Sequence, residues 1–189
     1  MGRQTHVGYH NCRNEGGKEF LKSSVPFLSG DGDNQWLTQG YYFWTDSPYW
    51  AERWNPGRDV AISEFKITFH TDDELLDLVG NAGHIFEFQK MRLKVAQHLD
   101  AKDVSKVTVS QVIDFLRALE RDGKHGIFPY LAVKAQDYAR ARDILKMFFI
   151  RRGKGEHLAC LTRQQLCVFE QGRDRIYFQG FVAPADYKE

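Results

Sequence analysis

Apolar and polar residues alternate along three segments in the first seventy residues of the chain. A period of two is typical of strands with one buried and one exposed face. Two short helices are expected between these strands, one in GGKEFLKSS and one in DSPYWAERW, where Asp46 or Ser47 can cap the helix and Pro48 can occupy its first turn. The segments predicted as strands are residues 5–12, 39–44 and 59–69.

The pattern changes between residues 72 and 122, where apolar residues recur every three or four positions. This spacing places them on one face of a helix, so residues 72–122 are predicted as a helical insert of two or three helices. Strand patterns return after residue 125, in YLAVKA, MFFIRR, HLACL, QLCVFE and RIYFQGFV. Helices segregated from strands in this way predict an α+β fold, with residues 1–189 as a single domain.

The composition is that of a folded protein that needs neither disulfides nor metal. The chain has 189 residues, 42% of them hydrophobic, which is enough for a full core. Its net charge of +1 means that any nucleic-acid-binding surface must be a local patch. The odd count and unpaired spacing of Cys12, Cys160 and Cys167 predict reduced thiols and no metal site. Without an apolar run of signal-peptide or membrane-spanning length, we expect a soluble, cytoplasmic protein.

Aromatic residues are dense between Leu37 and Trp54, in LTQGYYFWTDSPYWAERW. A buried strand would explain some of these rings. A site for a flat aromatic ligand would explain more of them, because such ligands stack on aromatic side chains. The segment alone leaves both interpretations open.

Three segments contain residues that could take part in chemistry: His10 in GYHNC, Tyr42 in GYYF and Gln165 in QQLCVFE. Each has a structural explanation when taken singly, as a histidine at a strand end, an aromatic core strand and a solvated glutamine. Taken together, their order and form resemble the ADP-ribosyltransferase superfamily. The branch is the histidine–tyrosine–glutamate one, which includes diphtheria-type toxins and the poly(ADP-ribose) polymerases.

The chain departs from the pattern of this family at two motif positions. Asn11 stands where glycine is usual, and Gln165 stands where the family has glutamate. The resemblance covers roughly residues 5–70 and 125–182, and it leaves the helical middle of the chain without a counterpart. The fold it implies is a pair of split antiparallel β-sheets.

The resemblance implies that NAD is the substrate and that its nicotinamide is released. The nicotinamide ring would lie between Tyr42 and Trp54, with Trp50 one helical turn earlier on the same face. His10 would donate a hydrogen bond to a hydroxyl of the nicotinamide ribose, beside Asn11. Gln165 would hold the ribose 2′-hydroxyl through its amide oxygen, without the negative charge that the usual glutamate brings to an oxocarbenium-like transition state.

In this family the loop before the third motif strand faces the acceptor of ADP-ribose. Four basic residues there predict a nucleic-acid acceptor, RNA or single-stranded DNA, although a solvated charged surface explains them as well. The resemblance extends to bacterial toxins of toxin–antitoxin or phage-defence modules, whose partner would be a cognate antitoxin protein. The basic residues are Arg151, Arg152, Lys154 and Arg163.

Three other interpretations remain open at this stage. The acceptor could be a protein. The substitutions at Asn11 and Gln165 could mark a module that binds ADP-ribose or a nucleotide with little or no catalysis. The aromatic residues could also be no more than the core of an α+β protein.

Overall fold

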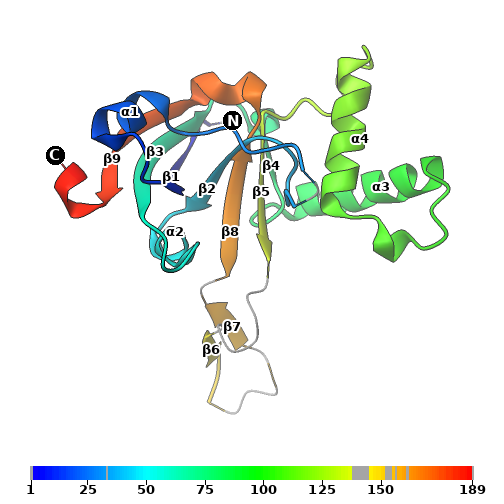
Figure 1. Cartoon of the computed structure of the whole chain (residues 1–189). Coiled ribbons are helices and arrows are strands. Elements are labelled where there is room, and N and C mark those ends of the chain that lie inside the picture. The colour runs from blue at the N-terminus through cyan, green and yellow to red at the C-terminus, as the bar shows by residue number, and fades with distance from the viewer. Residues whose placement is uncertain are drawn as a thin grey trace.

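The computed structural model describes residues 2–32, 34–137, 145–151, 155, 157–160 and 162–188. The chain is an α+β protein built on a seven-stranded, mostly antiparallel sheet with the strand order β4-β5-β8-β2-β1-β3-β9 (Figure 1). A separate two-stranded hairpin is formed by β6 and β7. The strands are β1 (Gln4–Arg13), β2 (Tyr41–Thr45), β3 (Val60–Phe69), β4 (Leu75–Asp77), β5 (Ala132–Asp137), β6 (Leu145–Phe148), β7 (His157–Cys160), β8 (Arg163–Val168) and β9 (Ile176–Ala183). The α-helices are α1 (Gly17–Ser24), α2 (Tyr49–Arg53), α3 (Ala82–His98) and α4 (Val109–Arg121).

Each strand predicted from alternation is present, with ends that differ by a few residues. The two faces of the sheet are buried in different cores. Neighbouring residues of one strand belong to opposite cores, as Leu166 and Cys167 of β8 do. One core contains Leu21 of α1, and the other contains buried residues of α3 and α4. The central strands are therefore covered on both faces.

The sheet is nearly divided between β1 and β2. The antiparallel ladder of these strands contains two residue pairs, Gly8 with Thr45 and Tyr9 with Trp44, whereas β1 and β3 pair over ten residues. The sequence resemblance predicted two split sheets, and the structure has one continuous sheet with this short junction. Beyond Tyr9, the paths of β1 and β2 no longer form a ladder, and this is where the candidate site lies.

The helical insert is confirmed as two α-helices, α3 and α4, within residues 72–122. The start of the segment differs from the helical prediction, because Leu75 and Leu76 lie in β4, which pairs in parallel with β5. Both leucines are buried, one in each core. Two adjacent apolar residues fit a short strand buried on both faces as well as they fit a helix.

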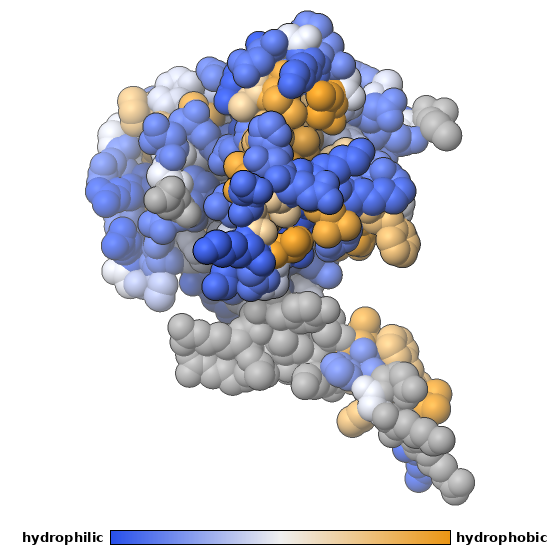
Figure 2. All heavy atoms as spheres, turned by 90° about the vertical axis from the view of Figure 1, so that its right-hand side faces the viewer, coloured by the Kyte–Doolittle hydropathy of each residue, from blue (hydrophilic) through white to orange (hydrophobic). Residues whose placement is uncertain are grey.

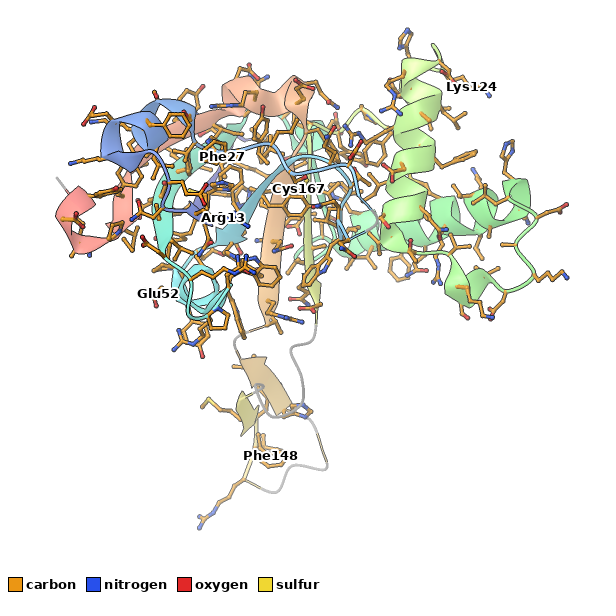
Figure 3. The ribbon with its side chains drawn as sticks, viewed as in Figure 1. Arg13, Phe27, Glu52, Lys124, Phe148 and Cys167 are labelled. Carbon is orange, nitrogen blue, oxygen red and sulfur yellow. The ribbon has the colours of Figure 1, made fainter. Side chains whose placement is uncertain are left out.

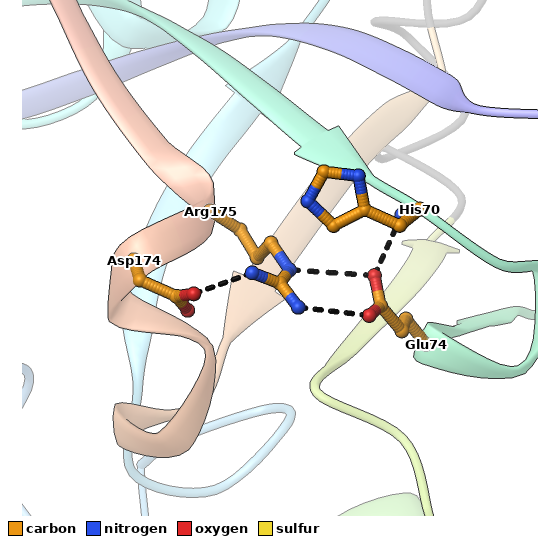
Figure 4. Close-up of polar contacts among 4 residues, drawn as sticks. All are labelled: His70, Glu74, Asp174 and Arg175. Carbon is orange, nitrogen blue, oxygen red and sulfur yellow. Dashed lines mark hydrogen bonds and ion pairs between the residues drawn. The ribbon is translucent and has the colours of Figure 1, made fainter.

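A partly buried ion pair joins the start of this segment to the chain before β9 (Figure 4). The Arg175 guanidinium donates to both carboxylate oxygens of Glu74, at 2.9 and 3.4 Å, and also pairs with Asp174. The same Glu74 carboxylate accepts the backbone N–H of His70 at 2.7 Å. These bonds join residues 101 positions apart and hold the start of β4 beside the start of β9 and the end of β3.

The β6–β7 hairpin projects away from the body of the molecule and carries apolar side chains on its surface (Figures 1 and 2). Five of its side chains are between 48% and 67% exposed, namely Met147, Phe148, Phe149, Ile150 and Leu158. Within the described ranges, no helix is long and apolar enough to cross a membrane.

Candidate functional site

A cavity of about 320 Å³ opens where β1 and β2 diverge. Its size falls in the lower part of the range of about 300–1,000 Å³ that is usual for small-molecule sites. Of the described residues that line it, none is an aspartate, glutamate, lysine or arginine. They are His10, Asn11, Ser29, Asn34, Gln35, Trp36, Tyr42, Phe43, Trp44, Trp54 and Gln165.

Five residues that the sequence singled out therefore line one cavity, although they are up to 155 positions apart in the chain. His10 and Asn11 come from β1, Tyr42 from β2 and Gln165 from β8, while Trp54 follows α2. The register explains part of this convergence, because Trp44 lies opposite Gln165 and Tyr42 opposite Cys167. Residues paired or two apart in adjacent strands share a face, so Tyr42, Trp44 and Gln165 share one.

His10 is only 8% exposed, and both of its ring nitrogens meet backbone groups. Nδ1 lies 3.0 Å from the carbonyl oxygen of Tyr42, and Nε2 accepts the backbone N–H of Phe27 at 3.3 Å. Because a carbonyl only accepts, the Nδ1–H tautomer is the one consistent with these contacts. Burial lowers the pKa of His10 from its ordinary value of 6.5, and the bond to Tyr42 opposes this only in part.

This tautomer corrects the role given to His10 from the sequence. In the neutral ring Nε2 has no proton, so it can accept a bond from a ligand hydroxyl but cannot donate one. A ligand at this nitrogen would share it with, or displace, the N–H of Phe27, which lies in the segment after α1 (Figure 3).

Tyr42 is held by its hydroxyl group at the side of the cavity. The hydroxyl donates to the Thr38 carbonyl at 2.7 Å and accepts the backbone N–H of Leu37 at 2.9 Å. Burial raises its pKa, so the phenol stays protonated and can make both bonds at neutral pH. Gly40 is required nearby, because a Cβ there would lie 2.4 Å from Cys167 Sγ and 2.8 Å from the Val168 carbonyl.

Two amides in the cavity wall have hydrogen-bonding groups without a partner in the described part of the chain. The Gln165 side chain is only 8% exposed and makes no hydrogen bond to a described residue. Asn11 donates from Nδ2 to the Ala51 carbonyl at 2.8 Å, but its buried Oδ1 accepts nothing. A buried polar group without a partner costs free energy, so the Asn11 oxygen is suited to accept a bond from a ligand. The Gln165 amide lines the cavity and is available to a polar ligand there.

Gln164 differs from the neighbouring Gln165 in its position and in its hydrogen bonds. It lies outside the cavity, where its amide contacts Thr45, Gln136 and Thr162. Alternation along β8 separates the two glutamines, as the sequence register requires. Of the two, only Gln165 can reach a ligand in the cavity.

The two tryptophans predicted to share a face lie in different places. Trp54 lines the cavity, is 42% exposed and packs on Trp44 with ring centroids 5.3 Å apart. The indole N–H of Trp50 instead donates to the Thr162 carbonyl at 3.2 Å, beside a depression outside the cavity. The helical spacing between them does not apply, because α2 ends at Arg53 and Trp54 has extended backbone angles.

Trp36 and Trp44 were not predicted as site residues. The sequence could have predicted Trp44 as a site residue, because it lies two residues after Tyr42 in the same strand and therefore shares its face. Trp36 lies outside any predicted element, and sequence periodicity gives no information about it.

The proposed acceptor residues are only partly described. Arg151 is exposed at the end of the segment after β6, while Arg152 and Lys154 lie outside the described residues. The acceptor-binding role predicted for Arg163 needs correction, because its guanidinium is not a free cation. It pairs with the Asp137 carboxylate through two hydrogen bonds, one of 2.8 Å from Nε, and lies over the Trp36 ring.

Among the described residues, the remaining chemical groups of interest are the potential metal ligands and the cysteine thiols. In the part of the chain that the structure describes, no three His, Cys, Asp or Glu residues lie close enough together to hold a metal ion. Cys12 and Cys167 are free thiols, and burial raises their pKa to about 11 and about 12. Both therefore stay protonated and poorly nucleophilic at neutral pH.

The site thus combines aromatic rings, a neutral histidine and two amides in a cavity whose described lining contains no charged side chain. Such a cavity can stack a flat heterocycle and hydrogen-bond its polar substituents. No protein-family model matches the chain, and searches of curated proteins and of solved structures also found no match.

Proposed function

We propose that the chain is an NAD-dependent mono-ADP-ribosyltransferase that cleaves nicotinamide from NAD and transfers ADP-ribose to a macromolecule. The observation that carries this proposal is the convergence of His10, Tyr42 and Gln165 on one cavity. These are the residues at which the three short segments resemble the superfamily, and they come from three strands. The cavity in which they meet opens beyond the short ladder between β1 and β2.

Nicotinamide would bind as the flat heterocycle, with its ring against Tyr42 and with Trp54 closing the open side. Stacking on each ring adds roughly 0.5–1.5 kcal/mol beyond the area buried. The unpartnered Asn11 Oδ1 could accept a hydrogen bond from the carboxamide of nicotinamide, which presents an NH₂ group. These contacts bind and orient the leaving group.

In the reaction, the glycosidic C–N bond breaks and nicotinamide leaves with the electron pair. The ribose carbon becomes oxocarbenium-like, and a nucleophile of the acceptor forms the new bond and loses its proton. Gln165 Oε1 would accept the bond from the ribose 2′-hydroxyl, and His10 Nε2 could accept another ribose hydroxyl. With no carboxylate among the described residues of the cavity wall, the positive charge would be stabilised there by amide and aromatic dipoles.

The acceptor we propose is RNA or single-stranded DNA. Phe148 and Phe149 are each 67% exposed on the projecting hairpin, with exposed Arg151 close behind them in the chain. Exposed aromatic rings beside cations are the combination on which unpaired bases stack and phosphates bind. In the chain the hairpin lies between β5 and β8, the strand that carries Gln165, and it projects beyond the ends of these two strands (Figure 3). The cellular role we propose is that of a cytoplasmic toxin, in a toxin–antitoxin or phage-defence module, with an antitoxin protein as partner.

One observation favours a second function, the binding of ADP-ribose or a nucleotide without turnover. Among its described lining residues the cavity has no carboxylate such as the superfamily uses, and Asn11 stands where the family has glycine. Amides and stacked rings are sufficient to bind a nucleotide base. Release of nicotinamide separates the two functions, because a binding module takes up NAD without producing it.

The direct test is incubation of the protein with adenylate-labelled NAD and a mixture of RNA, single-stranded DNA and cell protein. We expect free nicotinamide and label on nucleic acid. Replacing both Phe148 and Phe149 by Ser should reduce that label, while hydrolysis of NAD by water continues. Phe86→Ser on α3, where the side chain is 69% exposed, is the matched control. Label on protein alone would contradict the nucleic-acid acceptor, and binding without nicotinamide release would favour the second function.

A further inference from the structure

Thr38 has an unusual backbone conformation beside the cavity. Its φ is +69°, in the left-handed region that β-branched residues rarely adopt, and the residue is only 3% exposed. Such a conformation persists only where the surrounding structure holds it, and residues of this kind concentrate at functional sites. The contacts of Thr38 therefore show what holds it in place.

Thr38 bonds to the nearby Tyr42 and to two side chains of the distant helix α4, those of Arg117 and Asp114. Its carbonyl oxygen accepts the Tyr42 hydroxyl at 2.7 Å. Its own hydroxyl, Oγ1, accepts a bond from Arg117 at 2.7 Å, and Arg117 also donates to the neighbouring Gln39 carbonyl at 3.2 Å. Thr38 is thus a direct link between Arg117 of α4 and Tyr42 of β2.

Arg117 is itself fixed by packing. Its guanidinium lies over the ring of Phe169 at 4.0 Å from the centroid, and that ring is fully buried in the core beneath α4. A planar guanidinium can stack and donate in its own plane at the same time, which a lysine ammonium cannot do. The position of the Thr38–Gln39 backbone is therefore set from the helical insert and not only from β2.

We infer that Arg117 is a positioning residue, which holds Thr38 and through it fixes the ring of Tyr42 at the wall of the cavity. This gives the helical insert, for which the family resemblance offers no counterpart, a defined role in the site. The inference rests on the proposed function for its effect on NAD, but its structural part concerns Tyr42 alone.

Arg121 provides a matched control for Arg117. It lies one helical turn further along α4, and both arginines line the same polar cavity of about 570 Å³ outside the candidate site. Arg121 makes no hydrogen bond to Thr38 or Gln39. Loss of its charge changes the same polar cavity without changing the link to Tyr42.

The experiment compares Arg117→Met, Arg117→Lys and Arg121→Met with the wild type. The first readout is the NMR resonance of the Tyr42 ring in ¹³C-tyrosine-labelled protein, assigned with Tyr42→Phe. The second is the affinity for nicotinamide, followed by quenching of the cavity tryptophans. We expect Arg117→Met to shift the Tyr42 resonance and to weaken nicotinamide binding by about tenfold, as expected for one lost bond to a charged group. Arg117→Lys should give a smaller change, and Arg121→Met should match the wild type.

An unshifted Tyr42 resonance in Arg117→Met, or equal shifts in Arg117→Met and Arg121→Met, would overturn the inference. If Arg117→Met does not fold, Arg117→Lys provides the same comparison, because it keeps the charge and loses the stacked, planar donor. The Tyr42 resonance requires no NAD. A shift confined to the Arg117 variants in a protein that releases no nicotinamide would therefore support the positioning role and contradict the proposed function separately.

Discussion

His10 donates its Nδ1–H to the carbonyl oxygen of Tyr42 at 3.0 Å, across the point where β1 and β2 cease to pair. The side chain thus replaces a bond that the strand ladder no longer makes. It ties the first and second motif residues to each other, while Nε2 faces the Phe27 N–H. His10 therefore has a structural role in joining β1 to β2, besides the ligand-binding role that we propose for it.

We expect His10→Ala to lose nicotinamide release by at least about 10²-fold, as for other groups that contact a reacting centre in a closed site. The fold should be retained with a loss of roughly 1–3 kcal/mol, because the variant leaves buried polar partners unpaired. His6→Ala is the control, since His6 lies outside the cavity on the same strand. Nicotinamide release at the wild-type rate from folded His10→Ala would exclude a role for this side chain.

The free energy of unfolding should fall as the pH is lowered from 6.5. Burial lowers the pKa of both His10 and His6 below their ordinary 6.5. Below pH 6.5 the unfolded chain therefore binds more protons than the folded one, so stability rises with pH across this window. The contribution is complete above pH 6.5 and is lost as the pH falls through the lowered pKa. Urea unfolding between pH 7.5 and 5 should show a shallower pH dependence for His10→Gln than for the wild type, and identical slopes would contradict the assignment.

Tyr42→Ala should weaken NAD binding far more than Tyr41→Ala. Tyr42 lines the cavity, whereas Tyr41 faces the other core and lies beneath Arg173. Tyr42→Phe should retain most of the stacking but lose the bonds to Thr38 and Leu37. Its affinity for NAD should therefore lie between those of Tyr41→Ala and Tyr42→Ala. Calorimetric titration with NAD measures these affinities. Equal losses for Tyr41→Ala and Tyr42→Ala would place the ligand elsewhere.

Trp54→Ala should raise the dissociation constant of nicotinamide by about tenfold, because about 0.5–1.5 kcal/mol of stacking is lost together with buried area. Trp50→Ala should leave that constant nearly unchanged and should instead destabilise the fold, because it removes the bond to Thr162. The comparison requires nicotinamide titration and thermal unfolding of both variants. A larger binding loss for Trp50→Ala would restore the arrangement expected from helical spacing.

Alternation and spacing predicted the strands and the two helices of the insert because these are local properties of the chain. They failed at Leu75 and Leu76, since a three-residue strand buried on both faces shows no alternation of apolar and polar residues. They also failed at Trp54, since a five-residue helix does not extend its 3.6-residue period to the residue beyond it.

The candidate site was predictable where it depended on strand register, as for Tyr42 and the choice between Gln164 and Gln165. Contacts between distant residues were not predictable. The pairing of Arg163 with Asp137 spans 26 residues, and the bond from Arg117 to Thr38 spans 79. The tautomer of His10 depends on the backbone of Phe27 and Tyr42, which no local pattern brings together.

The central claim is that Gln165 holds a ribose hydroxyl of NAD in this cavity, and one assay tests it most directly. Free nicotinamide released from NAD is measured for the wild type, Gln165→Ala and Gln164→Ala under identical conditions. The neighbouring glutamine is the matched control, because it has the same side chain, lies on the same strand and points out of the cavity. We predict release by the wild type, a loss of about 10²-fold or more in Gln165→Ala, and near-normal release in Gln164→Ala. Release that survives in Gln165→Ala, or that is lost in Gln164→Ala instead, would contradict the account.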